Sequence, residues 1–144
     1  MCKRGGTIMV ELLIGKKGSG KTKTLIEKVN AASMVADGNV VYICKDMSGI
    51  YDIKSNVRMC ETASFNMSSY KDLLFFIIGI ISGNYDITNI FIDGIFKIIN
   101  SEDLAGAEEF LKNIQDISNR FEVSFVISVS VDANDAPDYI KELA

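Results

Sequence analysis

A short segment near the start of the chain combines glycine, lysine and hydroxyl residues at a spacing suited to binding phosphate. The segment is Gly15-Lys16-Lys17-Gly18-Ser19-Gly20-Lys21-Thr22, and it matches the pattern G-x-x-x-x-G-K-[ST] at every fixed position. Glycines let the backbone curl so that consecutive amides point into one concavity, and a following helix adds its unpaired N–H groups. In such a loop Lys21 supplies charge to the β- and γ-phosphates, and the Thr22 hydroxyl is a magnesium ligand. We therefore predict that residues 15–23, including Lys23 directly after the motif, bind a nucleoside triphosphate.

Nucleotide chemistry also needs a second group directed at magnesium, usually an aspartate at the end of a buried strand. Asp93 meets this description because it closes the apolar segment Ile90-Phe91-Ile92. Taken alone, an Asp-Gly pair after a strand indicates an ordinary solvated turn. Together with the loop at residues 15–22, the magnesium role is the favoured interpretation. The expected ligand is therefore ATP together with Mg2+, and Thr22 and Asp93 are the expected ligands of the metal ion.

The elements that must position these residues alternate between short apolar segments and longer helical ones, the pattern of a parallel sheet with covering helices. Strands are expected at 8–14, 40–44, 89–93 and 123–131, and helices at 21–36, at 68–82, from 101 onward and from 137 onward. The polar stretch between the second strand and the second helix could hold a further short strand at 57–60. Gly38 is expected to end the first helix in a left-handed conformation. Ser101 is expected to cap the third, with Glu102 and Asp103 in its first turn. The pattern predicts an α/β fold of one domain, residues 1–144, with residues 1–7 as a flexible tail.

The bulk properties agree with one globular domain and exclude several kinds of site. The chain has 144 residues, 48% of them hydrophobic, with a single proline, and its apolar runs are too short to cross a bilayer. No signal peptide is evident, so we expect a cytoplasmic protein. The chain contains no histidine, which excludes histidine triads and histidine zinc sites. The three cysteines lack the spacing of a metal site. The net charge of −4, with no evident basic patch, disfavours nucleic acid as a partner.

Over residues 9–131 the chain resembles the RecA-like branch of the P-loop ATPases. The resemblance is carried by the 15–22 loop, the helix that follows it and the strand Val40-Val41-Tyr42-Ile43-Cys44-Lys45-Asp46. It implies a three-layer fold with a mainly parallel sheet, truncated because only residues 132–144 follow the last expected strand. It also implies that Asp46 is the catalytic base, and that Ser128 or Ser130 senses the γ-phosphate. Ser130 lies nearer the strand end and is the preferred candidate.

The chain also departs from that family. Gly94 follows Asp93, where many relatives carry a glutamate that activates water, and Asp46 is one methylene shorter than glutamate. Asp46 could equally be a polar residue that starts a loop, and Ser128 and Ser130 could be small residues of a packed strand. Lys23 stands where many relatives have a small hydroxyl residue.

Three functional hypotheses remain open from the sequence. The first is a RecA-like ATPase with slow or partner-dependent hydrolysis. The second is a phosphotransferase similar to thymidine kinases, and the third is a nucleotide sensor that does not hydrolyse its ligand. GTP is disfavoured because no Asn-Lys-x-Asp segment is present. The apolar segments Leu73–Ile81 and Ile95–Ile99 predict a homo-oligomer or a larger protein partner.

Overall fold

A five-stranded sheet forms the centre of the computed structural model, which describes residues 8–48 and 50–144. The strand order is β1-β5-β4-β2-β3, and all four pairings between neighbours are parallel. The strands are β1 (Val10–Gly15), β2 (Asn39–Cys44), β3 (Val57–Glu61), β4 (Ile87–Asp93) and β5 (Ser124–Ser130). The helices are α1 (Lys21–Val35), α2 (Tyr70–Ser82), α3 (Ile95–Ile99), α4 (Ala107–Phe121) and α5 (Asp138–Lys141), with a 3-10 turn at Ala63–Phe65. This arrangement confirms the predicted α/β fold.

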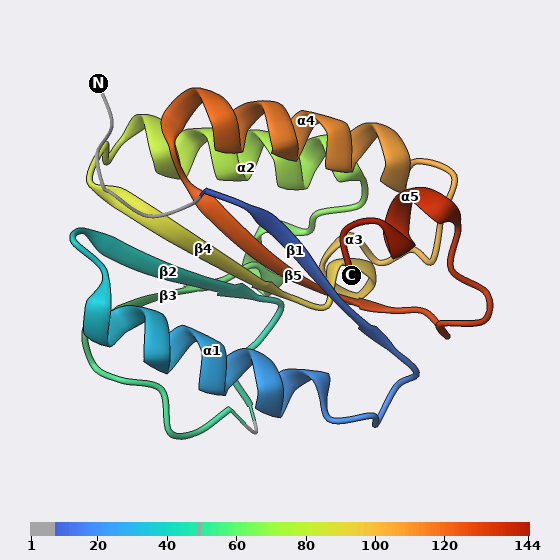
Figure 1. Ribbon diagram of the computed structural model, residues 1–144, viewed down its shortest axis with the longest axis horizontal. Helices are drawn as coiled ribbons and strands as arrows, with labels where there is room; N and C mark the ends of the chain where they lie inside the picture. Colours follow the sequence, from blue (N-terminus) through green and yellow to red (C-terminus); the bar gives the residue numbers. More distant parts are fainter. Residues whose placement is uncertain (1–7, 49) are drawn as a thin grey trace.

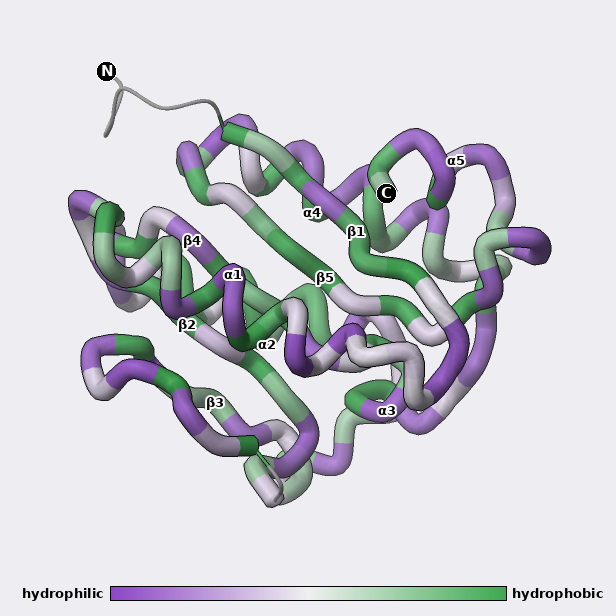
Figure 2. The backbone as a smooth tube through the Cα atoms, turned by 60° about the horizontal axis from the view of Figure 1, so that its bottom comes forward, coloured by the Kyte–Doolittle hydropathy of each residue, from purple (hydrophilic) through white to green (hydrophobic). Residues whose placement is uncertain are grey.

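The sheet is covered on both faces, which gives three layers (Figure 1). Helices α2 and α4 lie over one face and α1 lies over the other. The tube coloured by hydropathy shows β5 as mainly hydrophobic, with hydrophilic segments along α4 and in the surface loops (Figure 2). In β4, Ile90 and Ile92 belong to the core beneath α2 and α4, whereas Phe91 between them packs in the core beneath α1. Alternate side chains of a strand point to opposite faces, so a strand covered on both sides is apolar throughout.

The strand order places the carboxyl ends of β1, β5, β4 and β2 along one edge of the sheet. The register aligns Gly15 with Ser130 across β1 and β5, and Cys44 with Asp93 across β2 and β4. In open parallel sheets, ligands bind in the crevice outside these carboxyl ends. The loop at 15–22 and Asp93 therefore meet at the edge where a ligand is expected.

Gly38 does not form the left-handed helix cap that the sequence predicted. Helix α1 ends at Val35, its C-cap Ala36 is extended, and Gly38 is not among the glycines with positive φ. A Cβ atom added at Gly38 would instead lie 2.0 Å from the backbone oxygen of Asp86. The same oxygen accepts a hydrogen bond from the backbone N–H of Asn39 at 2.8 Å. Glycine is needed here because two backbone segments approach closely.

The predicted helix start at Ser101 is also wrong, since α4 begins at Ala107. The Ser101 hydroxyl accepts a hydrogen bond from the N–H of Asp103, and the Asp103 carboxylate accepts one from the N–H of Ala105. These side chains close local turns instead of capping a helix, as short polar residues often do. The acidic residues of the first turn of α4 are Glu108 and Glu109, beyond the expected pair.

The segment Ile95–Ile99 forms the short helix α3, which the sequence analysis did not anticipate. Ile95, Ile98 and Ile99 are buried in the core with the residues of α2 and α4, so this segment packs within the chain. In α2, Leu73, Ile77 and Ile81 are buried and Phe75 is 61% exposed. The predicted tail at residues 1–7 lies outside the described residues. None of the helices in the described part of the chain has the length and apolar character needed to cross a bilayer.

Candidate functional site

The loop at residues 15–22 adopts a conformation that glycines make accessible. Gly18 and Gly20 have φ values of +80° and +88°, a region that residues with a Cβ atom rarely adopt. A Cβ atom at Gly15 would lie 2.5 Å from the hydroxyl oxygen of Ser19. Gly20 is the N-cap of α1 and offers no side-chain hydrogen bond to the first turn. The amides at the start of a helix without a side-chain cap are free to receive an anion.

Lys21 begins α1, and its side chain folds back over the loop. Its Nζ donates to the backbone oxygens of Gly15 at 2.9 Å and Lys16 at 2.7 Å, with the Ser19 hydroxyl at 3.4 Å. Burial lowers the pKa of Lys21, the negative charge of Asp93 opposes this effect, and the positive charge of Lys97 adds to it. The ammonium group is thus held in place by loop carbonyls before any ligand binds.

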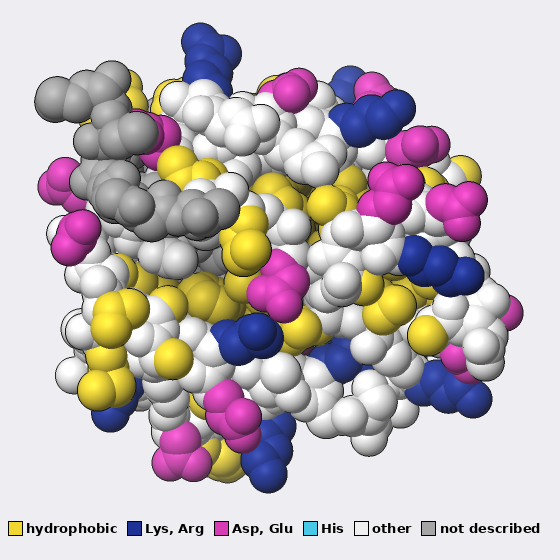
Figure 3. Space-filling view, in the orientation of Figure 1, with side chains coloured by type: hydrophobic (Ala, Val, Ile, Leu, Met, Phe, Trp, Pro, Cys, Tyr) yellow, Lys and Arg dark blue, Asp and Glu magenta, His cyan; other side chains and the backbone are white. Residues whose placement is uncertain are grey.

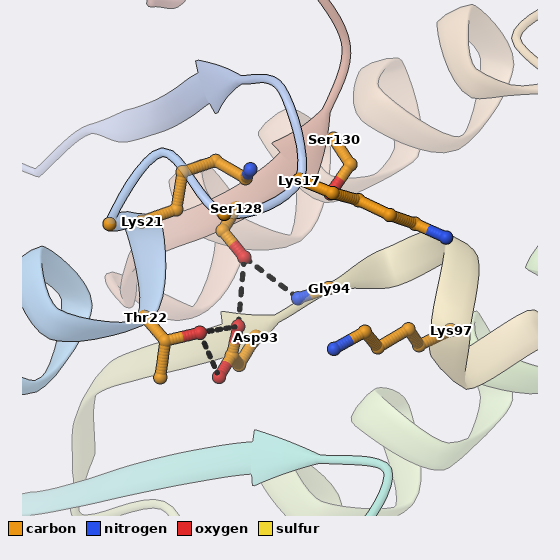
Figure 4. A pocket seen from close by; sticks show the side chains of 10 residues that line it. Lys17, Lys21, Thr22, Asp93, Gly94, Lys97, Ser128 and Ser130 are labelled. Carbon is orange, nitrogen blue, oxygen red and sulfur yellow. Dashed lines mark hydrogen bonds between the residues drawn. The ribbon is translucent and has the colours of Figure 1, made fainter.

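Asp93 lies at the centre of a hydrogen-bond network that joins four elements (Figure 4). Its two carboxylate oxygens accept from the Thr22 hydroxyl at 3.3 and 3.2 Å, across 71 residues of sequence. They also accept from the Ser128 hydroxyl at 3.1 Å and the Tyr42 hydroxyl at 2.9 Å. Ser128 accepts in turn from the N–H of Gly94 at 2.7 Å. Burial and the adjacent Asp93 raise the pKa of Tyr42, so the phenol remains a protonated donor.

These residues surround a hollow at the carboxyl edge of the sheet, with a volume of about 420 Å³. Its lining residues come from the loop, from the ends of β4 and β5 and from α3: Lys17, Gly18, Gly20, Lys21, Thr22, Asp93, Gly94, Lys97, Ser128 and Ser130. A neighbouring hollow of about 480 Å³ shares Lys17, Gly94, Lys97 and Ser130 with it. The structure therefore brings together the loop, Asp93 and Ser130, which the sequence had selected separately.

Asp46 lies beside this hollow rather than in it. It is exposed, two residues beyond the end of β2, and it lines a separate hollow of about 240 Å³ together with Thr22, Asp93 and Lys97. Its carboxylate accepts hydrogen bonds from the hydroxyl and the N–H of Ser48. These hydrogen bonds hold the pKa of Asp46 below its usual range. The carboxylate is engaged by its own loop and stays ionised.

The side chains of Lys16, Ser19 and Lys23 do not line the 420 Å³ hollow. Lys16 pairs with Asp132 at 3.3 Å. Lys23 is exposed on α1. The backbone of this segment, together with Lys17, Lys21 and Thr22, forms the surface available to a ligand.

Sequence reasoning missed two side chains of this site. Tyr42 was expected only as a strand residue, and Lys97 only as part of an apolar segment. The contact of Tyr42 with Asp93 depends on β2 pairing beside β4, which the sequence did not specify. The position of Lys97 depends on α3, whose five residues are too few for a helical period to be recognised.

Thr22 and Asp93 suit magnesium in their chemistry and in their convergence. Magnesium prefers oxygen ligands and usually takes one or two carboxylates, with waters and substrate phosphates completing an octahedron. A hydroxyl and a carboxylate from two distant segments meet here at 3.2 Å. Among the residues that the structure describes, no group of three or more Asp, Glu, Cys or His could hold a metal. A metal at this place would therefore need oxygens from a bound phosphate and from water.

Comparison with models of known protein families gives no match, and comparison with curated protein sequences gives none either. Among solved structures, the chain is similar to the pCW3 conjugation coupling protein TcpA, in its monomer form with ATPγS. The two are 15% identical with a TM-score of 0.46, and the match covers 94% of this chain and 46% of TcpA. This chain thus spans about half the length of that protein. A likeness at this level says nothing about the activity of this chain.

Charged side chains of both signs are interspersed on the face of the molecule seen in Figure 3. Lys and Arg side chains on this face alternate with Asp and Glu, with hydrophobic side chains between them. A positive field strong enough to attract a polyanion needs basic residues clustered together. The basic residues that matter for a ligand are those directed into the hollow beside the loop.

Proposed function

We propose that this chain binds ATP together with Mg2+ in the hollow at the 15–22 loop, and that it hydrolyses ATP slowly or only with a partner. The observation that carries the proposal is the convergence of Lys21, Thr22 and Asp93, from two segments, at one polar hollow. A cation, a hydroxyl and a carboxylate around exposed loop amides are the groups that a metal-bound triphosphate requires.

Each residue has a distinct task in this proposal. The loop amides and the first turn of α1 hold phosphate oxygens, and Lys21 exchanges its carbonyl acceptors for the β- and γ-phosphates. Thr22 and Asp93 hold the metal, which when bound neutralises charge on the phosphates. Ser128 and Tyr42 each donate a hydrogen bond to Asp93 and so keep its carboxylate oriented. Ser130 lines the hollow at the end of β5 and is the proposed γ-phosphate sensor.

Weak hydrolysis is part of the proposal because Asp93, the assigned metal ligand, is the only carboxylate of the described residues that lines the hollow. Gly94 stands next to Asp93, and the carboxylate of Asp46 is bound to Ser48. A general base must lie within hydrogen-bond reach of the water that it activates. The same observations favour a second candidate function, a nucleotide sensor that binds ATP without turnover and acts on a protein partner.

Assembly with other copies or with a larger protein is proposed on the exposed apolar residues of α2. Phe75 is 61% exposed and sits beside a shallow hollow of about 140 Å³ between α2 and α4. Light scattering at tens of micromolar protein, with and without ATP, tests this. A species heavier than the monomer in either condition supports self-assembly, and a monomer in both removes it, which leaves only a different protein as the partner of α2.

Equilibrium titration with a fluorescent ATP derivative, with and without Mg2+, tests the binding proposal. Lys21→Ala should weaken binding by about tenfold or more, because it removes a charge-assisted contact. Thr22→Ala should reduce the gain in affinity that Mg2+ gives. Thr24→Ala is a matched control, since the Thr24 hydroxyl donates to the Gly20 carbonyl and does not line the hollow.

Phosphate release from ATP then separates the two candidate functions. Turnover that Asp46→Asn lowers supports the slow ATPase with Asp46 as its base. Binding without turnover above background supports the sensor. A wild-type chain that binds no nucleotide at millimolar concentration would rule out both functions.

A further inference from the structure

Lys97 is a third cation at the 420 Å³ hollow, beside Lys17 and Lys21 of the loop, and the fold places it there through α3. The chain turns sharply at Gly94, whose φ is +74°. Ile95, Ile98 and Ile99 anchor α3 in the core, so that Lys97 lies on the side of this short helix away from the core. Its aliphatic stem covers Gly94, with its Cδ 3.6 Å from where a Cβ atom at that position would be. The side chain thus occupies the space beside Asp93 that a side chain at position 94 would otherwise enter.

The ammonium group of Lys97 forms no ion pair or hydrogen bond in the described part of the chain, although its charge adds to the hydrogen bonds from Ser48 in lowering the pKa of Asp46. Lys17 of the loop likewise forms none, whereas Lys16 pairs with Asp132, Lys28 with Glu11, Lys45 with Asn100 and Lys112 with Glu108. By contrast, none of the ion pairs or hydrogen bonds found between described residues involves Nζ of Lys97. It is directed toward the space that Asp93 faces (Figure 4), and it lines all three hollows around the loop.

Lys97 and Lys21 line the same hollow from different elements, so that two positive charges face one space. Two like charges facing one space repel each other when it holds only water. A multiply charged anion between them attracts both ammonium groups, and these attractions outweigh the repulsion between the two lysines. The pair is therefore suited to an anion with charge on two sides.

We infer that Lys97 binds the terminal phosphate of the nucleotide within the same chain, and so makes the site prefer a triphosphate over a diphosphate. This inference rests on the proposed function. Lys21 and the loop lie on one side of Asp93, and Lys97 reaches it from the other side (Figure 4). Phosphates held by the loop would extend past Thr22 toward Asp93, so the last one meets Lys97. Lysine acts there as a point charge on a flexible stem.

The test compares the affinities for Mg-ADP and for a non-hydrolysable Mg-ATP analogue in wild type, Lys97→Gln and Lys97→Arg. Lys97→Gln should weaken binding of the triphosphate by about tenfold or more and that of ADP by less than about threefold, because only the terminal phosphate loses a charge-assisted contact. Lys97→Arg keeps the charge and should retain most of the preference. Thermal melts check folding, which the change should not affect, because Lys97 is exposed.

Lys71→Gln is the control for net charge, since Lys71 is exposed on α2 and lines only the hollow between α2 and α4. At physiological salt, charges more than about 8 Å away are largely screened, so this change should alter neither affinity. Equal losses for ADP and the triphosphate in Lys97→Gln, or no loss for either, would overturn the role of Lys97 while leaving the proposed function standing. A wild-type chain that binds neither nucleotide overturns both.

Discussion

Replacing Asp93 by alanine should destabilise the fold even without nucleotide. The carboxylate accepts hydrogen bonds from the hydroxyls of Tyr42 and Ser128, and both residues are buried. A buried donor that loses its acceptor costs about 1–3 kcal/mol. Ser128 still accepts from the N–H of Gly94 and loses only its donor interaction. We therefore expect a loss of about 2–4 kcal/mol in the free energy of unfolding, toward the lower part of the combined range.

The assay is urea unfolding followed by circular dichroism, for four proteins: wild type, Asp93→Ala, Tyr42→Phe and the double variant. In the wild-type background, Tyr42→Phe removes a satisfied hydrogen bond and should cost about 1 kcal/mol. In the Asp93→Ala background it removes an orphaned hydroxyl and should instead restore about 1 kcal/mol or more. The coupling between the two sites should thus be about 2 kcal/mol or more.

Equal costs of Tyr42→Phe in the two backgrounds would refute this account of Asp93. An unfolding free energy of Asp93→Ala within about 0.5 kcal/mol of wild type, the size of an ordinary surface substitution, would also refute it. Asp93→Asn keeps one carbonyl acceptor and should be the milder change. It still removes the negative charge, so the Mg2+ dependence of ATP binding should fall in this variant as well.

Two further outcomes follow from the backbone and from a helix end. Gly38→Ala should destabilise the fold by about 1–3 kcal/mol or more, because the added carbon overpacks against the Asp86 carbonyl. Gly79→Ala places its added carbon where nothing lies within 4 Å, and should stabilise the fold by about 1 kcal/mol. Thermal melts of both variants measure this, and shifts of the same sign in both would contradict it. The pKa of Asp72 is lowered by the backbone N–H and the hydroxyl of Ser68, among other hydrogen bonds. A lowered carboxyl pKa stabilises above the unfolded pKa, about 4, and this contribution is lost as pH falls through the folded value. The Asp72→Asn variant should therefore lose less stability than wild type between pH 5 and pH 2, because about one titrating group fewer takes part. Identical dependence of the unfolding free energy on pH in the two proteins would contradict this.

The loop at residues 15–22 was recognisable from sequence because its residue pattern is local. The glycines at 18 and 20 take positive φ values, and their neighbours in the chain supply the lysine and the hydroxyl. The central strands were recognisable for a related reason. Segments such as Ile90–Ile92 are apolar at every position because both faces of the sheet are covered. Expectations at helix ends were less secure. Ser101 and Gly38 have residue types that suit helix caps. In the structure the Ser101 side chain forms a turn hydrogen bond instead, and glycine is required at position 38 by a close approach of two backbone segments.

The surroundings of Asp93 could not be derived in this way. The partners of its carboxylate come from α1, β2 and β5, and they meet only because β5 and β2 lie on either side of β4. Sequence reasoning preferred Ser130 over Ser128 by its distance from the strand end. The structure bonds Ser128 to Asp93 and leaves Ser130 at the rim. No spacing along the chain encodes which strands become neighbours.

By itself, the sequence determined the α/β class and indicated the glycine-rich loop at 15–22 and the carboxylate of Asp93, because backbone conformation and burial follow from residues close together in the chain. The tertiary structure alone decided the strand order, the orientation of Asp93 by Tyr42 and Ser128, and the position of Lys97 over Gly94. Each of these depends on packing between segments far apart in sequence. The free energy gained by burying the apolar faces of strands and helices decides which segments become neighbours, and the local residue pattern does not distinguish the alternatives.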